Sequence, residues 1–360
     1  MARVARRLDL GIVPALRSLA VFHAVAQGMG EDDPPTLILV QPEHPFVSVG
    51  YHQEAEREVD LERCAALGLP VYRRRVGGGA VLLDRGQVFF HLVLPERRAP
   101  AAVEERYRRY TLPALETYRD LGVPARFRPV NDLEVEHRKI GGTGGATLGC
   151  AAVFVGSILL EFDADTMAQV LRVPDVKMRD KLVRSLREYV TCVRRETGAV
   201  PDPARVKELL AGHFAAVLGE PLVRGELSAP ERELLPQVER ELASPEFLHR
   251  VRLPGDERPR RVKVSGRAAV REAVRKAPGG LLRAVARVAD GRLEEVLVSG
   301  DFYVYPQTAW ERLPERLRGV SLEREALERA VEGFFRDAMI VMPGVGPQEV
   351  VELLRQLAEG

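Results

Sequence analysis

The sequence predicts an α+β fold divided into two domains. Apolar residues recur at helical spacing in some segments and alternate at strand spacing in others, and the two kinds of segment follow no regular order. That irregular order indicates a largely antiparallel or mixed sheet. With 360 residues the chain exceeds the usual size of one compact domain. A Pro-, Arg- and Gly-rich stretch at residues 252–266 has the composition of a linker, so we expect domains at residues 1–250 and 265–360.

The first domain should contain several helices and short strands. Helical spacing predicts helices over residues 12–27, 59–67, 103–121, 203–218 and 230–243. Apolar runs bounded by turn residues predict two short strands over residues 35–53 and further strands at 71–75, 80–84, 87–95, 133–140 and 151–163. We expect the strands at 80–84 and 87–95 to form a hairpin around Arg85 and Gly86.

The second domain should be a small α+β unit. Asp290 and Gly291 lie between two alternating runs at residues 281–289 and 293–302, which is a strong hairpin signal. Helices are expected at residues 309–318 and 321–337, where Trp310, Phe334 and Phe335 have the spacing of core residues.

Composition argues against several classes of protein. The net charge of +1 provides no global field for nucleic acid, and the Arg-rich stretch at 258–275 has no aromatic residue for base stacking. No apolar run reaches the 18 residues needed to suggest a membrane span. Three cysteines at no metal-ligand spacing argue against a disulfide framework and a zinc site. We therefore expect a cytoplasmic protein without nucleic-acid or membrane partners.

The first candidate site is the segment Arg73 to Ala80, RRRVGGGA. Gly77, Gly78 and Gly79 would leave backbone N–H groups open to a phosphate, and the adjacent guanidinium groups of Arg73 and Arg74 would neutralise it. The alternative is a solvated basic strand end followed by a flexible turn. The spacing matches neither the P-loop nor the GxGxxG fingerprint.

The second candidate site runs from Asn131 to Gly145. Asn131 is the only asparagine of the chain, and its amide is suited to a carbonyl or phosphate. Asp132 is suited to a magnesium ion or a ribose hydroxyl, and Lys139 to an α-phosphate. The alternative is a turn, a surface lysine and a mobile glycine loop.

The order and spacing of the two segments resemble the lipoate-protein ligase A family. The segment RRRVGGGAVLLDRGQ matches the family pattern RR-x-x-GGGA-V-x-x-D-x-G-x, and NDLEVEHRKIGG matches an ND-hydrophobic pair followed by RK-[IV]-x-G. VSVGYHQ, VGSILLEFD and KLVRSLREYVT add further matches, so the likeness covers about residues 8 to 195. The segment GLLRAVARVADGRLEEVLVSGDFYVYP resembles the accessory domain that accompanies many such ligases.

The resemblance implies a catalytic domain that shares its fold with biotin ligases and class II aminoacyl-tRNA synthetases. It implies ATP-dependent activation of lipoate or octanoate with Mg²⁺, and transfer of the acyl group to a lysine of a lipoyl carrier domain. The implied carriers are a 2-oxoacid dehydrogenase E2 or a glycine cleavage H-type protein. Lys139 is the expected catalytic residue and Asp132 the expected magnesium ligand. The expected contacts to ATP or lipoyl-AMP are Arg73, Arg74, Gly77, Gly78, Gly79, Ala80, Asn131, Asp132, Lys139 and Gly156.

Some positions depart from the family pattern. Leu83 and Val155 stand where the family usually has histidine, and the segment SLAVFHAVA lacks the acidic residue of the first helix. Related octanoyltransferases carry a nucleophilic cysteine upstream of the lysine segment or in a later P-C-G motif, and both are missing here. We interpret Cys150 as a small buried hydrophobe. An ATP-independent octanoyl or lipoyl acyltransferase and a non-catalytic lipoate or lipoyl-domain binding protein remain the alternatives.

Overall fold

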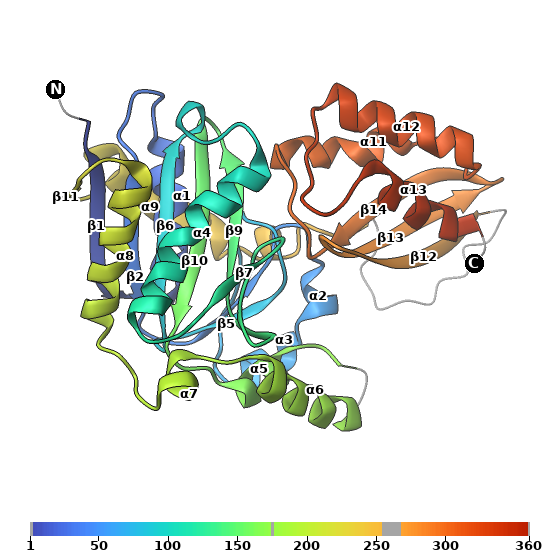
Figure 1. Ribbon diagram of the computed structural model, residues 1–360. Coiled ribbons are helices and arrows are strands. Elements are labelled where there is room, and N and C mark those ends of the chain that lie inside the picture. The colour runs from blue at the N-terminus through green and yellow to red at the C-terminus, as the bar shows by residue number, and fades with distance from the viewer. Residues whose placement is uncertain (1–2, 174–175, 254–267, 359–360) are drawn as a thin grey trace. The chain divides into compact units, whose positions relative to one another are not determined.

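The computed structural model describes residues 3–173, 176–253 and 268–358 (Figure 1). The described chain forms two compact units. The first contains residues Met1–Val49, Glu56–Arg75 and Ala80–Leu248, and the second contains Gly50–Ala55, Val76–Gly79 and His249–Gly360. The linker expected at 252–266 falls almost entirely outside the described residues. Two short segments from the N-terminal third thus belong to the second unit, which a single boundary near residue 255 does not anticipate.

An eight-stranded mixed sheet forms the centre of the first unit, with the order β11-β1-β2-β6-β10-β9-β8-β7. Its strands are β1 (Ala5–Val13), β2 (Thr36–Pro42), β6 (Gln87–Pro95), β7 (Arg126–Arg128), β8 (Asp132–Val135), β9 (Arg138–Leu148), β10 (Ala151–Leu159) and β11 (Leu222–Arg224). β1 is parallel to β2 and β11, and the other neighbours are antiparallel. A second, three-stranded sheet contains β3 (Phe46–Val49), β4 (Val71–Arg73) and β5 (Val81–Leu83). The predicted α+β class with a mixed sheet is confirmed.

Helices cover both faces of the large sheet. Phe90 packs against Phe214 of α8, and Phe154 packs against Tyr107 of α4, so α4 and α8 cover one face. His91 follows Phe90, points to the opposite face and contacts Phe22 of α1. The helices of this unit are α1 (Ala15–Gly28), α2 (Ala55–Glu58), α3 (Leu61–Ala66), α4 (Val103–Asp120), α5 (Ala164–Val170), α6 (Val176–Tyr189), α7 (Val193–Thr197), α8 (Pro203–Leu218), α9 (Ala229–Leu242) and α10 (Pro245–Leu248), with the 3-10 helix η1 (Glu96–Arg98).

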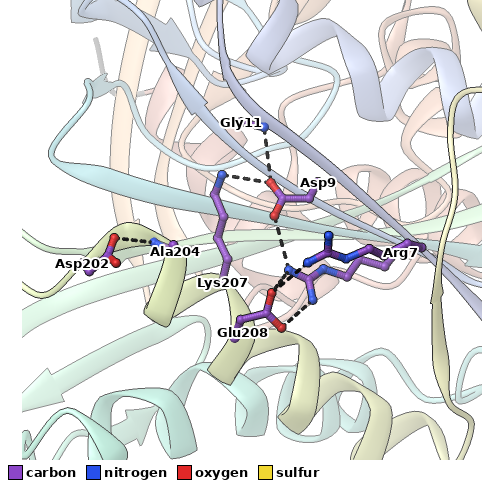
Figure 2. Close-up of polar contacts among 8 residues, drawn as sticks. Arg7, Asp9, Gly11, Asp202, Ala204, Lys207 and Glu208 are labelled. Atoms are coloured by element: carbon purple, nitrogen blue, oxygen red, sulfur yellow. Dashed lines mark hydrogen bonds and ion pairs between the residues drawn. The ribbon is translucent and has the colours of Figure 1, made fainter.

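A network of charged side chains joins α8 to β1 (Figure 2). Both nitrogens of the Arg7 fork donate to the Glu208 carboxylate, at 2.8 and 2.7 Å. Lys207, which is 6% exposed, donates to Asp9 at 3.0 Å. Asp9 also accepts the N–H of Gly11 across the bulge in β1. A buried lysine is costly unless it is paired, and Lys207 of α8 finds its partner in Asp9 of β1. The network therefore fixes α8 on the sheet.

Two predicted strand arrangements are wrong. β5 and β6 do not form a hairpin, because β5 pairs with β3 in the small sheet whereas β6, buried at all its positions, lies between β2 and β10. Residues 133–140 do not form one strand, because Glu136 and His137 take positive φ angles of 46° and 68° and turn the chain back on itself. The glycines that follow lie inside β9 and not in a loop.

The second unit is built on an antiparallel three-stranded sheet, β12 (Ala268–Ala277), β13 (Gly280–Ala289) and β14 (Arg292–Gly300). The predicted hairpin at Asp290 and Gly291 is confirmed. Trp310 makes edge-on contacts with Phe302, Phe334 and Phe335, which confirms its place in the core. The helices here are α11 (Leu313–Leu317), α12 (Arg324–Asp337) and α13 (Pro347–Arg355), with 3-10 helices η2 (Gln307–Arg312) and η3 (Gln356–Ala358). No helix in either unit is long and apolar enough, over the residues described, to cross a membrane.

The centre of the large sheet has no room for a side chain at Gly156. A Cβ atom there would lie 2.4 Å from the Phe90 ring, which is itself fully buried. We expect Gly156→Ala to lower the free energy of unfolding by about 1–3 kcal/mol, because overpacking forces neighbours out of position. Urea denaturation measures this. Gly212→Ala in α8 is the control, since nothing lies within 4 Å of its Cβ position, and it should be neutral or stabilising.

Candidate active site

The hairpin between β8 and β9 brings Lys139 and Asp132 together. The two-residue turn at Glu136 and His137 returns the chain so that the Lys139 Nζ atom lies 2.7 Å from Oδ1 of Asp132. The Lys139 side chain is 44% exposed and that of Asp132 is 20% exposed. The pair therefore presents an ammonium group to solvent above a mostly buried carboxylate.

Two cations hold Asp132 in its charged form. Burial alone would raise the pKa of the Asp132 carboxyl, but the charges and hydrogen bonds of Lys139 and Arg128 outweigh it, and the pKa lies below its usual value. Arg128 donates to the second carboxylate oxygen. Asp132 therefore stays ionised at neutral pH and fixes Lys139 by charge.

Gly142 provides the space in which the Lys139 ammonium lies. A Cβ atom on Gly142 would approach Nζ of Lys139 to 3.3 Å and Oδ1 of Asp132 to 3.8 Å. Thr143 pairs with Gly156, and Gly156 pairs with Phe90, so these three lie on the face covered by α4 and α8. Gly142 precedes Thr143 and points to the opposite face. The Lys139 side chain thus lies on the α1 face of the sheet.

Asn131 closes the same hairpin from its other end. Its side-chain amide donates to the carbonyl of Thr143 at 2.8 Å, while its own carbonyl accepts the N–H and hydroxyl of Thr143 at 2.8 and 3.1 Å. Gly156 is the registered neighbour of Thr143 on β10. The structure therefore places Asn131, Asp132 and Lys139 together at the β8–β9 hairpin, whereas a Cβ on Gly156 of β10 would point to the opposite face, against Phe90.

Arg73 has a structural position. It is 0% exposed, and its Nε and Nη2 atoms donate to the carbonyls of Phe247 at 2.9 Å and Leu248 at the end of α10. Arg74 donates to the carbonyl and hydroxyl of Ser48 at 3.1 and 3.3 Å. In this arrangement the Arg73 guanidinium stabilises the C-terminus of a short helix. Its expected contact with phosphate stays a prediction.

Gly77, Gly78 and Gly79 belong to the second unit, whereas Ala80, which follows them, belongs to the first. A Cβ on Gly77 would lie 2.3 Å from the carbonyl oxygen of Phe302, and the N–H of Gly78 donates to that same oxygen at 3.2 Å. A Cβ on Gly50 would lie 1.8 Å from the carbonyl oxygen of Gly78, whose φ is +86°. Close backbone packing thus requires these glycines, and their predicted contact with phosphate stays a prediction.

All three cysteines of the chain are free. The interpretation of Cys150 as buried is wrong: it is exposed and follows the end of β9, roughly 30 Å along the strand from Lys139 at about 3.3 Å per residue. Cys64 is 0% exposed, and burial raises its pKa to about 11. Cys192 is 8% exposed and follows Thr191, whose N–H donates to the Lys139 carbonyl at 2.8 Å. Cys192 is therefore connected to Lys139 through the backbone hydrogen bond of the residue that precedes it.

The residues around Asp132 do not form a metal cage by themselves. Both of its carboxylate oxygens accept from cations, and within residues 3–173, 176–253 and 268–358 no cluster of three or more His, Cys, Asp or Glu side chains is arranged to hold an ion. Mg²⁺ is usually bound by one or two carboxylates together with substrate phosphates. The expectation that Asp132 binds magnesium therefore stays a prediction.

Sequence reasoning missed two residues that support this site. Arg128 is the second cation on Asp132. Tyr118 of α4 is fully buried, and its hydroxyl donates to the Ile140 carbonyl at 2.7 Å and accepts the Leu159 N–H at 2.8 Å. It therefore holds β9 to β10 directly behind Lys139. The alternation Arg126-Phe127-Arg128 signals a short strand, but nothing local in the sequence shows which carboxylate it faces.

Comparison with known proteins identifies the family. Residues 14–215 match the family described as the lipoyl protein ligase A/B catalytic domain. The octanoyltransferase LipM of Kyrpidia tusciae is 35% identical over 271 residues, which cover 68% of this chain and 98% of that protein. The structure of a bi-partite lipoate protein ligase from Thermoplasma acidophilum, studied with its E2 lipoyl domain, superposes with a TM-score of 0.64 at 28% identity, over 69% of this chain and 98% of that one.

Two further structures extend the likeness. A lipoate-protein ligase A bound with ATP superposes with a TM-score of 0.60 at 26% identity, over 68% of this chain and 98% of that chain. Plasmodium falciparum LipL1 in complex with lipoate superposes with a TM-score of 0.69 over 98% of this chain and 99% of that chain; at 14% identity it shows a shared fold alone. The chain belongs to the lipoyl protein ligase A/B catalytic-domain family. It is thus an enzyme of the group that contains lipoate ligases and octanoyltransferases.

The Asp132 carboxylate should give stability a defined pH dependence. Since its folded pKa is depressed, its contribution is fully present above the unfolded pKa of about 4 and is lost as pH falls through the lower folded pKa. We expect Asp132→Asn to be less stable than wild type near pH 7, with the difference shrinking as pH falls below about 4. Urea denaturation across pH measures it.

Asp165→Asn is the matched control for this experiment. The Asp165 side chain pairs with Arg187 at 2.6 Å, but both are more than half exposed, so its removal should change stability little. A stability difference for Asp132→Asn that grows toward low pH would contradict the assignment.

Proposed function

We propose that the chain is an ATP-dependent lipoate-protein ligase that activates lipoate to lipoyl-AMP and passes the acyl group to a lysine of a lipoyl carrier domain. The observation that carries this proposal is the Lys139 ammonium, held 2.7 Å from Asp132 and open to solvent beside glycine-lined strands. The ammonium group supplies positive charge on one face of the sheet, and the glycines beside it let a substrate approach the backbone closely. No exposed thiol lies next to Lys139.

The reaction would proceed in two displacement steps at the same active site. The lipoate carboxylate attacks the α-phosphorus of MgATP, and pyrophosphate leaves. The ε-amine of a carrier lysine then attacks the acyl carbon of the mixed anhydride and loses a proton, and AMP leaves. Lys139 stabilises the negative charge that develops in both steps, which is electrostatic preorganisation and requires no enzyme nucleophile.

The part of the chain that has no counterpart in the octanoyltransferases supports ATP-dependent ligation over octanoyl transfer. The Kyrpidia octanoyltransferase is matched over 98% of its own length by only 68% of this chain, so about a third of this chain has no counterpart in it. The second unit is a folded α+β body with its own core. We propose that it is the accessory domain of the ligase. E2 or H-type carriers and a cytoplasmic setting belong to the same proposal, and free cysteines are typical of a reducing compartment.

A second candidate function is octanoyl transfer through a cysteine thioester. The octanoyltransferase names among the relatives favour it, and Cys192 is the residue that would carry it, because the preceding Thr191 bonds to the Lys139 backbone. In that reaction the thiolate takes the octanoyl group from a carrier thioester and the target lysine then displaces the thiolate. Burial of Cys192 argues against free access to a carrier.

Replacement of Lys139 tests the proposed site. We expect Lys139→Ala to lower the rate of lipoate-dependent pyrophosphate release by roughly a hundredfold or more, because an electrostatic transition-state contact is lost. Because Lys139 pairs with the mostly buried Asp132, the variant should also lose some stability, so the rates are compared under conditions in which both proteins are folded. Lys276→Ala on β12 is the control. Near-normal pyrophosphate release by Lys139→Ala would refute the assignment.

Replacement of Cys192 separates the two candidate functions. We expect Cys192→Ser to retain ATP-dependent lipoylation of a carrier domain, and wild type to acquire no acyl adduct when incubated with octanoyl carrier protein. Mass spectrometry of the intact protein measures the adduct. An octanoyl adduct on wild type that disappears in Cys192→Ser, and persists in Cys150→Ser, would establish the transferase instead.

A further inference from the structure

Five charged side chains alternate in sign across strands β7, β8 and β9. In order they are Arg126, Glu134, Arg128, Asp132 and Lys139, and all belong to the first unit. The two arginines of β7 lie opposite the two carboxylates of β8, which places opposite charges on facing positions of neighbouring strands. The Lys139 ammonium thus lies at one end of a ladder of ion pairs.

Arg128 is the middle member of this ladder because it contacts two carboxylates. Its Nη2 atom donates to Oδ2 of Asp132, and its Nε atom lies 3.5 Å from Oε2 of Glu134. The other oxygen of Glu134 accepts from Nε of Arg126 at 3.0 Å. A planar guanidinium can bind two acceptors in this way, whereas an ammonium group is a single point of charge. Arg128 is therefore held independently of Lys139.

Asp132 needs a cation that stays with it. Its side chain is only 20% exposed, and its two oxygens have different partners, Lys139 on Oδ1 and Arg128 on Oδ2. A carboxylate charge in such a place is costly when it is left uncompensated. With Lys139 as its one partner, Asp132 would hold the ammonium group and cancel its charge.

The proposed reaction requires Lys139 to offer its charge elsewhere. The ammonium group must turn to the negative charge that develops on the acyl donor. Because Arg128 remains on Oδ2, Asp132 keeps a compensating cation while this happens. Three cations face two carboxylates in the ladder, so one positive charge stays uncancelled for the donor.

We propose that Arg128 is a positioning residue for the reaction: it stays on Asp132 while the Lys139 ammonium turns to the acyl donor. The inference rests on the proposed function, since it assumes that Lys139 meets the donor. Arg128 acts through Asp132 and Lys139 and touches no reacting atom. Because Lys139 stabilises charge in the transition state, the loss of Arg128 should lower kcat more than it changes KM.

Variants at positions 128 and 126 separate positioning from a general effect of charge. We expect Arg128→Ala to lower kcat about tenfold, the lower end of what a hydrogen bond to a charged group is worth, with a smaller change in KM for the acyl donor. Arg128→Lys keeps a cation at that position and should recover most of kcat. Arg126→Ala is the matched control, because it removes the same charge from the same strand but its partner is Glu134. Its kcat should stay close to that of wild type.

A double-mutant cycle tests whether the effect passes through Asp132. In the Asp132→Asn background no carboxylate charge is left to compensate, so adding Arg128→Ala should lower kcat by less than about twofold. A role of Arg128 in packing, or through Glu134, would keep its full effect in that background. Where Asp132→Asn has no measurable turnover, the comparison of Arg128→Ala with Arg128→Lys and Arg126→Ala decides. Urea denaturation of every variant establishes that the rates come from folded protein.

The inference and the proposed function fail in different ways. Loss of activity in Lys139→Ala without loss in Arg128→Ala would overturn the inference alone. It is also overturned if Arg128→Lys or Arg126→Ala is as slow as Arg128→Ala. Near-normal activity of Lys139→Ala would overturn both. If wild type uses an octanoyl carrier protein and no ATP, the ligase proposal fails alone, and the same comparison of kcat is made with that donor.

Discussion

The charge pair of Lys139 and Asp132 packs closely against a glycine. A Cβ atom at position 142 would lie 3.3 Å from Nζ of Lys139, so a side chain there would shift the ammonium group that lies 2.7 Å from the Asp132 carboxylate. The turn at Glu136 and His137 sets the register that brings the pair together. Glu136 is not a residue that normally takes positive φ, whereas His137 does so more readily, so tertiary contacts help to hold the hairpin. Asn131 and Thr143 supply them, with three hydrogen bonds across its open end.

The basic and glycine-rich segment follows a different principle. The sequence predicts that its arginines bind a polyanion. In the structure, however, the Arg73 guanidinium donates to carbonyls of α10, and that of Arg75 pairs with Glu241. Arginine is suited to both tasks because its planar fork bonds carbonyl, carboxylate and phosphate oxygens alike. The guanidinium groups of Arg73 and Arg75 thus hold neighbouring helices, while the glycine backbone packs closely against the Phe302 carbonyl.

The sequence predicted the types of the secondary-structure elements well and the pairing of the strands poorly. The helix at 203–218, the mixed sheet and the Asp290-Gly291 hairpin are local patterns, and they are confirmed. The pairing of β5 with β3 instead of β6 depends on contacts between distant residues, which periodicity does not reveal. Asn131, Asp132, Lys139 and Gly156 were all named from motifs, and the first three lie together at the β8–β9 hairpin. Arg128 and Tyr118, which act through tertiary contacts, were not named.

Ligases and octanoyltransferases can share this arrangement because both must stabilise negative charge on an acyl group as a lysine attacks it. Under the proposed function, Lys139 would serve that step with either donor. The donors differ in what must be provided beforehand: a thioester route needs a thiolate that a carrier can reach, and an adenylate route needs amides and cations for phosphates. In this chain the thiol next to the Lys139 backbone is buried, so a carrier has little access to it. The proposed ligase route rests on this difference in access, and the relatives matched by sequence include both kinds of enzyme.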